Sequence, residues 1–186
     1  LGYKKQFGEL NFSANGNISF IKNEVTYVGE NKEFISGGAG FQSMGNVTRT
    51  QVGEGFNAFY GFKTNGVFQT ADDINAYVGP SGTPIQPDAA PGDFKWQDIN
   101  GDGTITDDDR TFLGSPLPKY TFGLTVNLDY KGFDLNVLLQ GVGQRTIFRS
   151  GGFSAPIAGG AWWNQGAKPI YGKTWTPDNK KEKYHE

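Results

Sequence analysis

The chain has 186 residues and a formal net charge of −2, so its charge does not point to a nucleic-acid partner. No run of about 18 apolar residues occurs, which excludes a transmembrane helix but not spanning strands that are polar on one face. The absence of cysteine excludes disulfides, thiolate metal sites and cysteine nucleophiles. The 28 glycines and the 15% of aromatic residues favour strands and turns over helices.

The first predicted element is Leu10–Phe20, with the sequence LNFSANGNISF. Apolar or small residues alternate with Asn and Ser along it. Because successive strand residues point to opposite faces, this alternation predicts a strand with one apolar and one polar face. The length matches the about 9–11 residues that a tilted strand needs to cross a bilayer.

The next stretches carry weaker patterns. Ile21–Glu24 is expected to turn, and Val25–Val28 is expected to begin a return strand. Glu30–Gly45 is rich in Gly, Ser and Asn and is expected to form a loop. Val47–Phe68 is aromatic and interrupted by glycines, which predicts one bent strand or two short ones.

Two further segments precede the central loop. Thr70–Ala76 begins with an N-cap-like Thr followed by acidic residues, which predicts one short helical turn. Gly79–Gly92 is rich in proline and glycine and is predicted to be irregular, since proline cannot donate to a strand ladder.

The segment Asp98–Asp109, DINGDGTITDDD, fits the spacing of a twelve-residue calcium loop. Gly103 stands where that loop makes its sharp turn, and Asp109 stands where an EF-hand has a longer Glu, as in the dockerin version. The alternative is an Asx-rich turn that satisfies its own backbone. No helices are predicted on either side. The candidate calcium ligands are Asp98, Asn100, Asp102, Thr104, Thr106 and Asp109.

The strongest pattern is Tyr120–Gln140. Apolar residues occupy every even position from Tyr120 to Tyr130, and Thr, Gly, Asn and Asp occupy the odd positions. After Lys131-Gly132 the alternation resumes at Phe133, which predicts an antiparallel hairpin with a two-residue turn. Aromatic residues at both ends are typical of transmembrane strands. A long hairpin in a soluble sandwich is the alternative.

The remaining segments predict no catalytic site. The carboxylates of Asp107–Asp109 lie in a Gly- and Asp-rich loop, where such groups are usually solvated or metal-bound, and His185 is the sole histidine. No enzyme activity is therefore expected. Gly141–Gly160 is Gly-rich and Ala161–Trp175 carries three Trp, which suits core anchors, loops or an interface belt. Pro177–Glu186 is expected to be an exposed segment.

The run from Pro91 to Gln140 resembles the C-terminal barrel region of SusC/RagA-type TonB-linked outer-membrane proteins. The matching elements are PGD, the D-x-NGDG-x-I-x-x-x-D loop, an Asp-Arg pair followed by G-x-P-x-PK-(Y/F), and the YKGFD segment before a strand that ends in Gln-Gly. Upstream, Gly53–Phe68 resembles the family segment G-x-x-x-x-x-FYG-(Y/F)-x-x-x-G-(I/V)-F.

The resemblance implies an all-β fold in which residues 1–186 form part of an antiparallel transmembrane β-barrel of about 22 strands. Residues 98–109 would lie in an extracellular loop, and the location would be the bacterial outer membrane. The implied function is import of oligosaccharides or oligopeptides, energised by TonB and assisted by a SusD-like surface lipoprotein. Because residue 1 is Leu and the sequence opens with neither an initiator Met nor a charged-then-apolar leader, we expect the chain to begin inside a longer protein. Set against the family, the chain is expected to be a portion of the barrel without the plug domain. A soluble cell-surface calcium-binding β module for adhesion or carbohydrate binding is the alternative.

Overall fold

A computed structural model describes residues 1–38, 45–148 and 175–180 and contains β-strands with almost no helix. The chain divides into two compact units. Unit 1 comprises Leu1–Gly37, Arg49–Ala58 and Gly114–Ile147, and unit 2 comprises Gly38–Thr48, Phe59–Leu113 and Phe148–Glu186. The elements are β1 (Gly2–Phe7), β2 (Leu10–Phe20), β3 (Phe34–Gly37), β4 (Thr48–Gln51), β5 (Ala58–Gly61), β6 (Thr64–Val67), α1 (Ala71–Ala76), β7 (Phe94–Trp96), η1 (Asp107–Asp109), β8 (Thr111–Gly114), β9 (Tyr120–Tyr130) and β10 (Phe133–Gly143).

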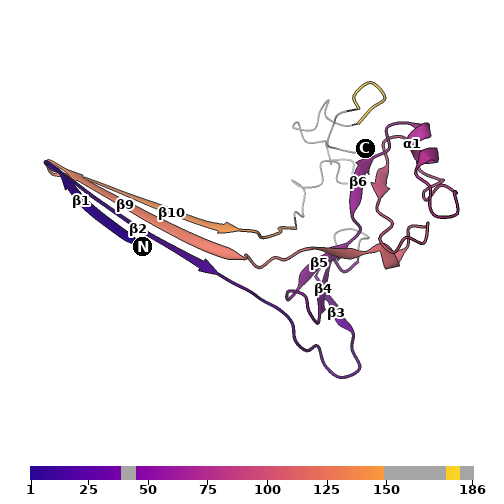
Figure 1. Cartoon of the computed structure of the whole chain (residues 1–186), viewed down its shortest axis with the longest axis horizontal. Helices are drawn as coiled ribbons and strands as arrows, with labels where there is room; N and C mark the ends of the chain where they lie inside the picture. The colour runs from indigo at the N-terminus through magenta and orange to yellow at the C-terminus, as the bar shows by residue number, and fades with distance from the viewer. Residues whose placement is uncertain (39–44, 149–174, 181–186) are drawn as a thin grey trace, which may run out of the picture. The chain divides into compact units, whose positions relative to one another are not determined.

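Unit 1 is dominated by one antiparallel sheet with the strand order β1-β2-β9-β10 (Figure 1). The predicted hairpin is confirmed, because β9 and β10 pair through the turn at Lys131-Gly132. The predicted strand Leu10–Phe20 is also confirmed, and it pairs with β9 along its whole length, from Leu10 opposite Tyr130 to Phe20 opposite Tyr120. The four strands therefore form one continuous ladder.

The structure corrects two expectations in the segment after β2. The predicted return strand Val25–Val28 does not form, since Val25 exchanges backbone hydrogen bonds with the turn at Gly53 and Glu54 (2.9 and 2.8 Å). The run spans only four residues, whereas β9 supplies 11 residues that pair with β2 along its whole length. The predicted loop Glu30–Gly45 contains the short strand β3, which lies beside β4; residues 39–44 are outside the described residues.

The aromatic segment Val47–Phe68 forms three short strands, β4, β5 and β6, one more than expected. Within unit 2, β5 neighbours β8, and β6 pairs antiparallel with β7. The predicted helical turn is confirmed as α1. Its N-cap Thr70 accepts from the Asp73 amide (3.1 Å), while the Asp73 carboxylate accepts from the Thr70 amide (3.2 Å). Gly79–Gly92 forms no strand and contributes to one isolated bridge.

Unit 2 has a small hydrophobic core. Phe68, Ile74 and Ile85 are buried. Trp175 lies over Gly92, where a Cβ would come within 2.7 Å of the indole ring, and the positive φ of Gly92 also favours glycine. The Trp175 indole N–H donates to the Gln69 side chain (3.0 Å), so this Trp is a core anchor. The expectations for residues 149–174 and 181–186 lie outside the described residues. None of the described helices is long and apolar enough to cross a membrane.

Candidate functional site

The apolar faces of β1, β2, β9 and β10 align into one surface. Residues opposite one another in an antiparallel ladder share a face, so the registers place the predicted apolar positions of all four strands on the same side. That face is built from Tyr3, Phe7, Leu10, Phe12, Ala14, Ile18, Phe20, Tyr120, Phe122, Leu124, Val126, Leu128, Tyr130, Phe133, Leu135, Val137 and Leu139.

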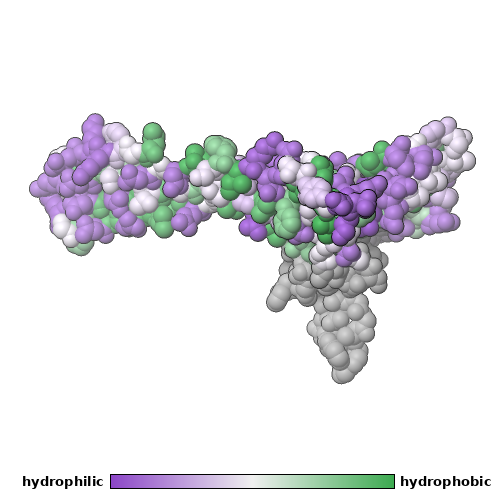
Figure 2. Space-filling model, turned by 90° about the horizontal axis from the view of Figure 1, so that it is seen from below, coloured by the Kyte–Doolittle hydropathy of each residue, from purple (hydrophilic) through white to green (hydrophobic). Residues whose placement is uncertain are grey.

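Ten of these 17 side chains are exposed, and the other seven are partly exposed. Phe20 is 77% and Phe133 80% exposed, and Ile18, Leu135 and Leu139 are each more than half exposed. Hydrophobic surface is visible along the sheet in Figure 2, and the end that carries the short turns is hydrophilic. A soluble antiparallel sheet buries its apolar face against a core, so an exposed face of this extent indicates a surface that contacts another apolar phase.

Aromatic residues gather at both ends of the apolar face. At one end the rings of Phe20 and Tyr120 lie 6.2 Å apart. The rings of Phe122 and Tyr120 lie over Gly141 and Gly143 of β10, where a Cβ would overlap them. Phe7, Tyr130 and Phe133 occupy the other end, which follows from the registers. Such paired aromatic belts are typical of strands that cross a bilayer.

One charged residue interrupts the apolar face in the described part of this sheet. Lys5 of the edge strand β1 lies opposite Phe12, near the end with the short turns, and its Nζ lies 5.0 Å from the ring centre of Phe7. A lysine side chain can keep its methylenes in apolar surroundings while its ammonium group extends to a polar boundary.

The two ends of the sheet differ in their connections. Both hairpin turns, at Gly8-Glu9 and at Lys131-Gly132, lie at the same end, and the Lys131 ammonium is 2.9 Å from the Glu9 carboxylate. At the opposite end β2 and β9 are joined by the whole of residues 21–119, which includes the segment Asp98–Asp109, called the acidic loop. Short turns at one rim and long connections at the other are typical of bacterial outer-membrane barrels.

The acidic loop is closed by Asp109, which is fully buried. One carboxylate oxygen accepts from the amides of Ile99 (2.8 Å) and Asn100 (3.4 Å), and the other accepts from the amide of Thr106 (2.8 Å). Burial would raise the pKa of Asp109, but these three amide bonds outweigh it and lower the pKa from its ordinary value. Asp109 therefore joins both ends of the loop as an ionised acceptor.

The other predicted ligands make local turns. Asp98 accepts from the amides of Gly101 (2.7 Å) and Gly103 (2.8 Å), and Asn100 accepts from the amide of Asp102 (2.9 Å). The Asp102 carboxylate accepts from both the amide and the hydroxyl of Thr104 (2.8 Å each), and these bonds lower its pKa. The contacts of Asn100 and Asp102 are Asx turns of the kind that the alternative to a calcium loop requires.

The side chain of Thr106 is an N-cap rather than part of an Asx turn. Its hydroxyl accepts from the amide of Asp108 (3.3 Å) at the start of η1. Within residues 1–38, 45–148 and 175–180, no three acidic side chains lie close enough together to hold a metal ion. The calcium assignment stays a prediction.

Arg110 fixes the loop within unit 2, a role that the sequence pattern did not reveal. Its guanidinium donates to the Asn46 carbonyl (3.2 Å) and lies over the rings of Tyr60 and Phe62, at 5.6 and 5.8 Å from their centres. Asp107 lies 3.9 Å away and is largely exposed, so that ion pair adds little. Arg110 thus connects the Asp-Arg motif to the aromatic FYGF segment through cation–π contacts.

Known proteins with similar sequences identify the family of this chain. No protein-family model matches the chain. The chain is 30% identical over 134 residues to TonB-dependent receptor P3 and 37% identical over 101 residues to TonB-dependent receptor P26, both of Formosa agariphila. It is 30% identical over 129 residues to TonB-dependent receptor SusC of Bacteroides thetaiotaomicron. These matches cover 71%, 54% and 67% of this chain but 13%, 10% and 11% of the relatives, so the chain spans a small part of their length. The chain belongs to the family of TonB-dependent receptors, of which SusC is a member.

Proposed function

We propose that the chain is a segment of a TonB-dependent outer-membrane importer, in which β1, β2, β9 and β10 are adjacent strands of the transmembrane barrel. The observation that carries this proposal is the single apolar face across four aligned strands, with aromatic belts at both ends. In a soluble cell-surface module the apolar face would have to be covered, whereas ten of the 17 side chains that build this face are exposed.

The remaining parts of the transporter are proposed from its family. Its barrel would have about 22 strands, closed around a plug domain that the TonB complex acts on. A SusD-like lipoprotein would capture the substrate, an oligosaccharide or an oligopeptide, at the cell surface. In this arrangement the even positions of β9 contact lipid and the odd positions line the lumen.

The connections of the sheet set its orientation. Because bacterial barrels have short periplasmic turns, the turns joined by Glu9 and Lys131 would face the periplasm. Residues 21–119 would then begin and end at the extracellular rim, with the acidic loop and Arg110 outside the cell.

Labelling of cysteines in intact cells tests this orientation. In the full-length receptor, Ser115→Cys should react with a membrane-impermeant maleimide, because Ser115 precedes the extracellular start of β9. Lys131→Cys is the matched control at the opposite end of the same strand, and it should react only after the outer membrane is breached. Protection of Ser115→Cys together with labelling of Lys131→Cys would reverse the topology and contradict the proposal.

For the loop Asp98–Asp109 we propose calcium as a structural ligand, held by Asp98, Asn100, Asp102 and Asp109 with the Thr104 carbonyl and a water near Thr106. The spacing of oxygen donors supports this, as does the carboxylate of Asp109, which draws the two ends of the loop together. The ion would act as a clip on an extracellular loop and would take no part in catalysis.

Chelation tests the calcium proposal. Extracellular calcium sites of this kind bind at about 10⁻⁴–10⁻³ M, so removal of calcium should speed proteolytic cleavage between Trp96 and Arg110 in the full-length receptor. The barrel should stay folded, since its strands are held by their own ladders. Equal cleavage with and without chelator, and an unchanged pattern for Asp98→Ala, would show that the segment is an Asx-rich turn.

A further inference from the structure

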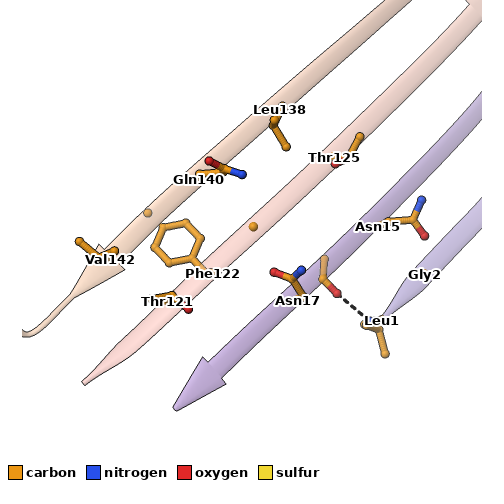
Figure 3. A pocket seen from close by; sticks show the side chains of 13 residues that line it. Leu1, Gly2, Asn15, Asn17, Thr121, Phe122, Thr125, Leu138, Gln140 and Val142 are labelled. Carbon is orange, nitrogen blue, oxygen red and sulfur yellow. Dashed lines mark hydrogen bonds between the residues drawn. The ribbon is translucent and has the colours of Figure 1, made fainter. Parts of the chain in front are cut away.

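Lys5 is held on the apolar face of the sheet by the register of β1. Leu1, directly before β1, exchanges two backbone hydrogen bonds with Gly16 of β2 (2.6 and 2.8 Å), one of which is drawn in Figure 3. The pairing continues from there without interruption to Phe7. A slip by one residue would bring Lys4 to the apolar face and turn Lys5 to the polar face. The ladder thus places the Lys5 side chain among apolar neighbours.

The Lys5 ammonium has no acidic partner within residues 1–38, 45–148 and 175–180. Lys131, at the same end of the sheet, is instead paired with Glu9 (2.9 Å). No Asp or Glu occupies the apolar face of β1, β2, β9 or β10, because Asp129 and Asp134 lie on the polar face. Lys5 therefore adds a positive charge that no described residue of this sheet neutralises.

The ammonium group of Lys5 extends towards the end of the sheet that carries the short turns. Phe7 is two residues, or about 7 Å, nearer to that end than Lys5, and the Lys5 Nζ lies 5.0 Å from the centre of its ring. Phe7 belongs to the aromatic belt at this end, together with Tyr130 and Phe133. The lysine side chain thus runs from an apolar row of the sheet towards the belt.

A ligand that suits this place combines two kinds of chemistry. It needs an anionic oxygen that accepts from the ammonium near the belt. It also needs an apolar part that covers the row of Lys5, in which Phe12, Leu128 and Leu135 lie side by side across three strands. The phosphate diester and the acyl chains of a phospholipid supply both, whereas inorganic phosphate would leave the apolar side chains uncovered.

We propose that Lys5 binds the phosphate group of an anionic phospholipid in the periplasmic leaflet, with the acyl chains of that lipid along Phe12 and Leu128. This headgroup site rests on the proposed function, because it requires the apolar face to contact lipid and the short turns to face the periplasm. It adds a preference for one class of lipid at one place on the barrel. The attraction between a lysine near a membrane surface and an anionic lipid supplies that preference.

Local quenching by spin-labelled lipid tests the headgroup site in the full-length receptor. A bimane fluorophore attached to Ala14→Cys reports on the lipid beside Lys5, since Ala14 lies on the apolar face of β2, two residues from Phe12. The receptor is placed in phosphatidylcholine bilayers with increasing fractions of phosphatidylglycerol or phosphatidylcholine that carries a nitroxide on the same acyl carbon. Lys5→Met removes the charge from the apolar face. Lys4→Met is the matched control, because it removes the same charge from the neighbouring residue on the polar face.

With both lysines present, half-quenching should need about fivefold less labelled phosphatidylglycerol than labelled phosphatidylcholine, which corresponds to about 1 kcal/mol. Lys5→Met should abolish this difference, and Lys4→Met should keep it. Equal quenching by the two lipids with both lysines present, an unchanged difference after Lys5→Met, or its loss in both variants would overturn the headgroup site and leave the importer intact. If neither lipid quenched the bimane, the apolar face would not contact lipid, and the proposed function would fail together with the site.

A second substitution guards against a folding defect. Lys5→Gln keeps a polar side chain without the charge, and both Lys5 variants should give the heat-modifiable band of a folded barrel. If neither variant folded, Lys5 would be held by a protein group of the closed barrel rather than by lipid, and the headgroup site would be overturned.

Discussion

Replacement of Leu124 by arginine should destabilise the folded receptor in the membrane by about 2–4 kcal/mol, the cost of a basic side chain at the bilayer midplane of a β-barrel. Leu124 lies midway along the apolar face, opposite Gly16 on β2 and Leu139 on β10. At that depth an arginine has no nearby interface to reach and no partner charge on its face. The fraction of full-length receptor that runs as a heat-modifiable folded band in outer membranes should fall sharply.

Thr125→Arg is the matched control, because it adds the same side chain one residue along the same strand. Thr125 lies on the polar face beside Asn15, where the guanidinium would reach water in the lumen. The folded fraction should stay near that of the native receptor. Equal loss for both variants, or greater loss for Thr125→Arg, would mean that the even positions of β9 do not face lipid.

Asp109→Ala should loosen the acidic loop while leaving the membrane strands folded. The substitution removes the buried carboxylate that accepts from the partly buried amides of Ile99, Asn100 and Thr106. A lost hydrogen bond to a charged acceptor costs about 1.5–3 kcal/mol, and because water can reach the exposed residues that carry the amides, a local loss of about 1–3 kcal/mol is expected. Limited proteolysis of the full-length receptor should show faster cleavage between Trp96 and Arg110.

Asp108→Ala provides the comparison for this loop. Asp108 is the neighbouring carboxylate, it is exposed, and its side chain makes no hydrogen bond to the described residues. Its replacement should leave the cleavage rate close to that of the native receptor. A native rate for Asp109→Ala as well would show that the buried carboxylate does not hold the loop closed.

The sheet of β1, β2, β9 and β10 could be predicted where alternation was long and complete. Tyr120–Tyr130 and Leu10–Phe20 show it over a full strand, and the Lys131-Gly132 turn fixes the hairpin register. The strand β1 was missed because Lys4, Lys5 and Gln6 break the apolar pattern. The pairing of β2 with β9 was also missed, since it joins strands separated by residues 21–119 and no local signal specifies such a contact.

The acidic loop was predictable in position but not in internal geometry. The spacing of its Asp and Asn residues identified the segment, yet only the structure shows that Asp109 bonds amides at both ends of it. Likewise, the Asp-Arg motif gave no indication that Arg110 lies between Tyr60 and Phe62, because the three residues come together through tertiary packing. The short strands β3 to β6 were uncertain for a related reason: glycines and aromatic residues support several registers.

The central claim is that this sheet crosses a bilayer with its apolar face to lipid, and a nitroxide scan of β9 tests it most directly. Single spin labels at successive positions from Thr121 to Asp129 would be introduced into the full-length receptor in lipid bilayers. Their collision rates would be measured with oxygen, which concentrates in lipid, and with a water-soluble nickel complex. If the sheet crosses the bilayer in this way, the collision rates should alternate strictly along β9. Labels at positions 122, 124, 126 and 128 should be accessible to oxygen, and labels at the odd positions should be accessible to nickel. Uniform accessibility to nickel, or alternation in the opposite phase, would contradict it.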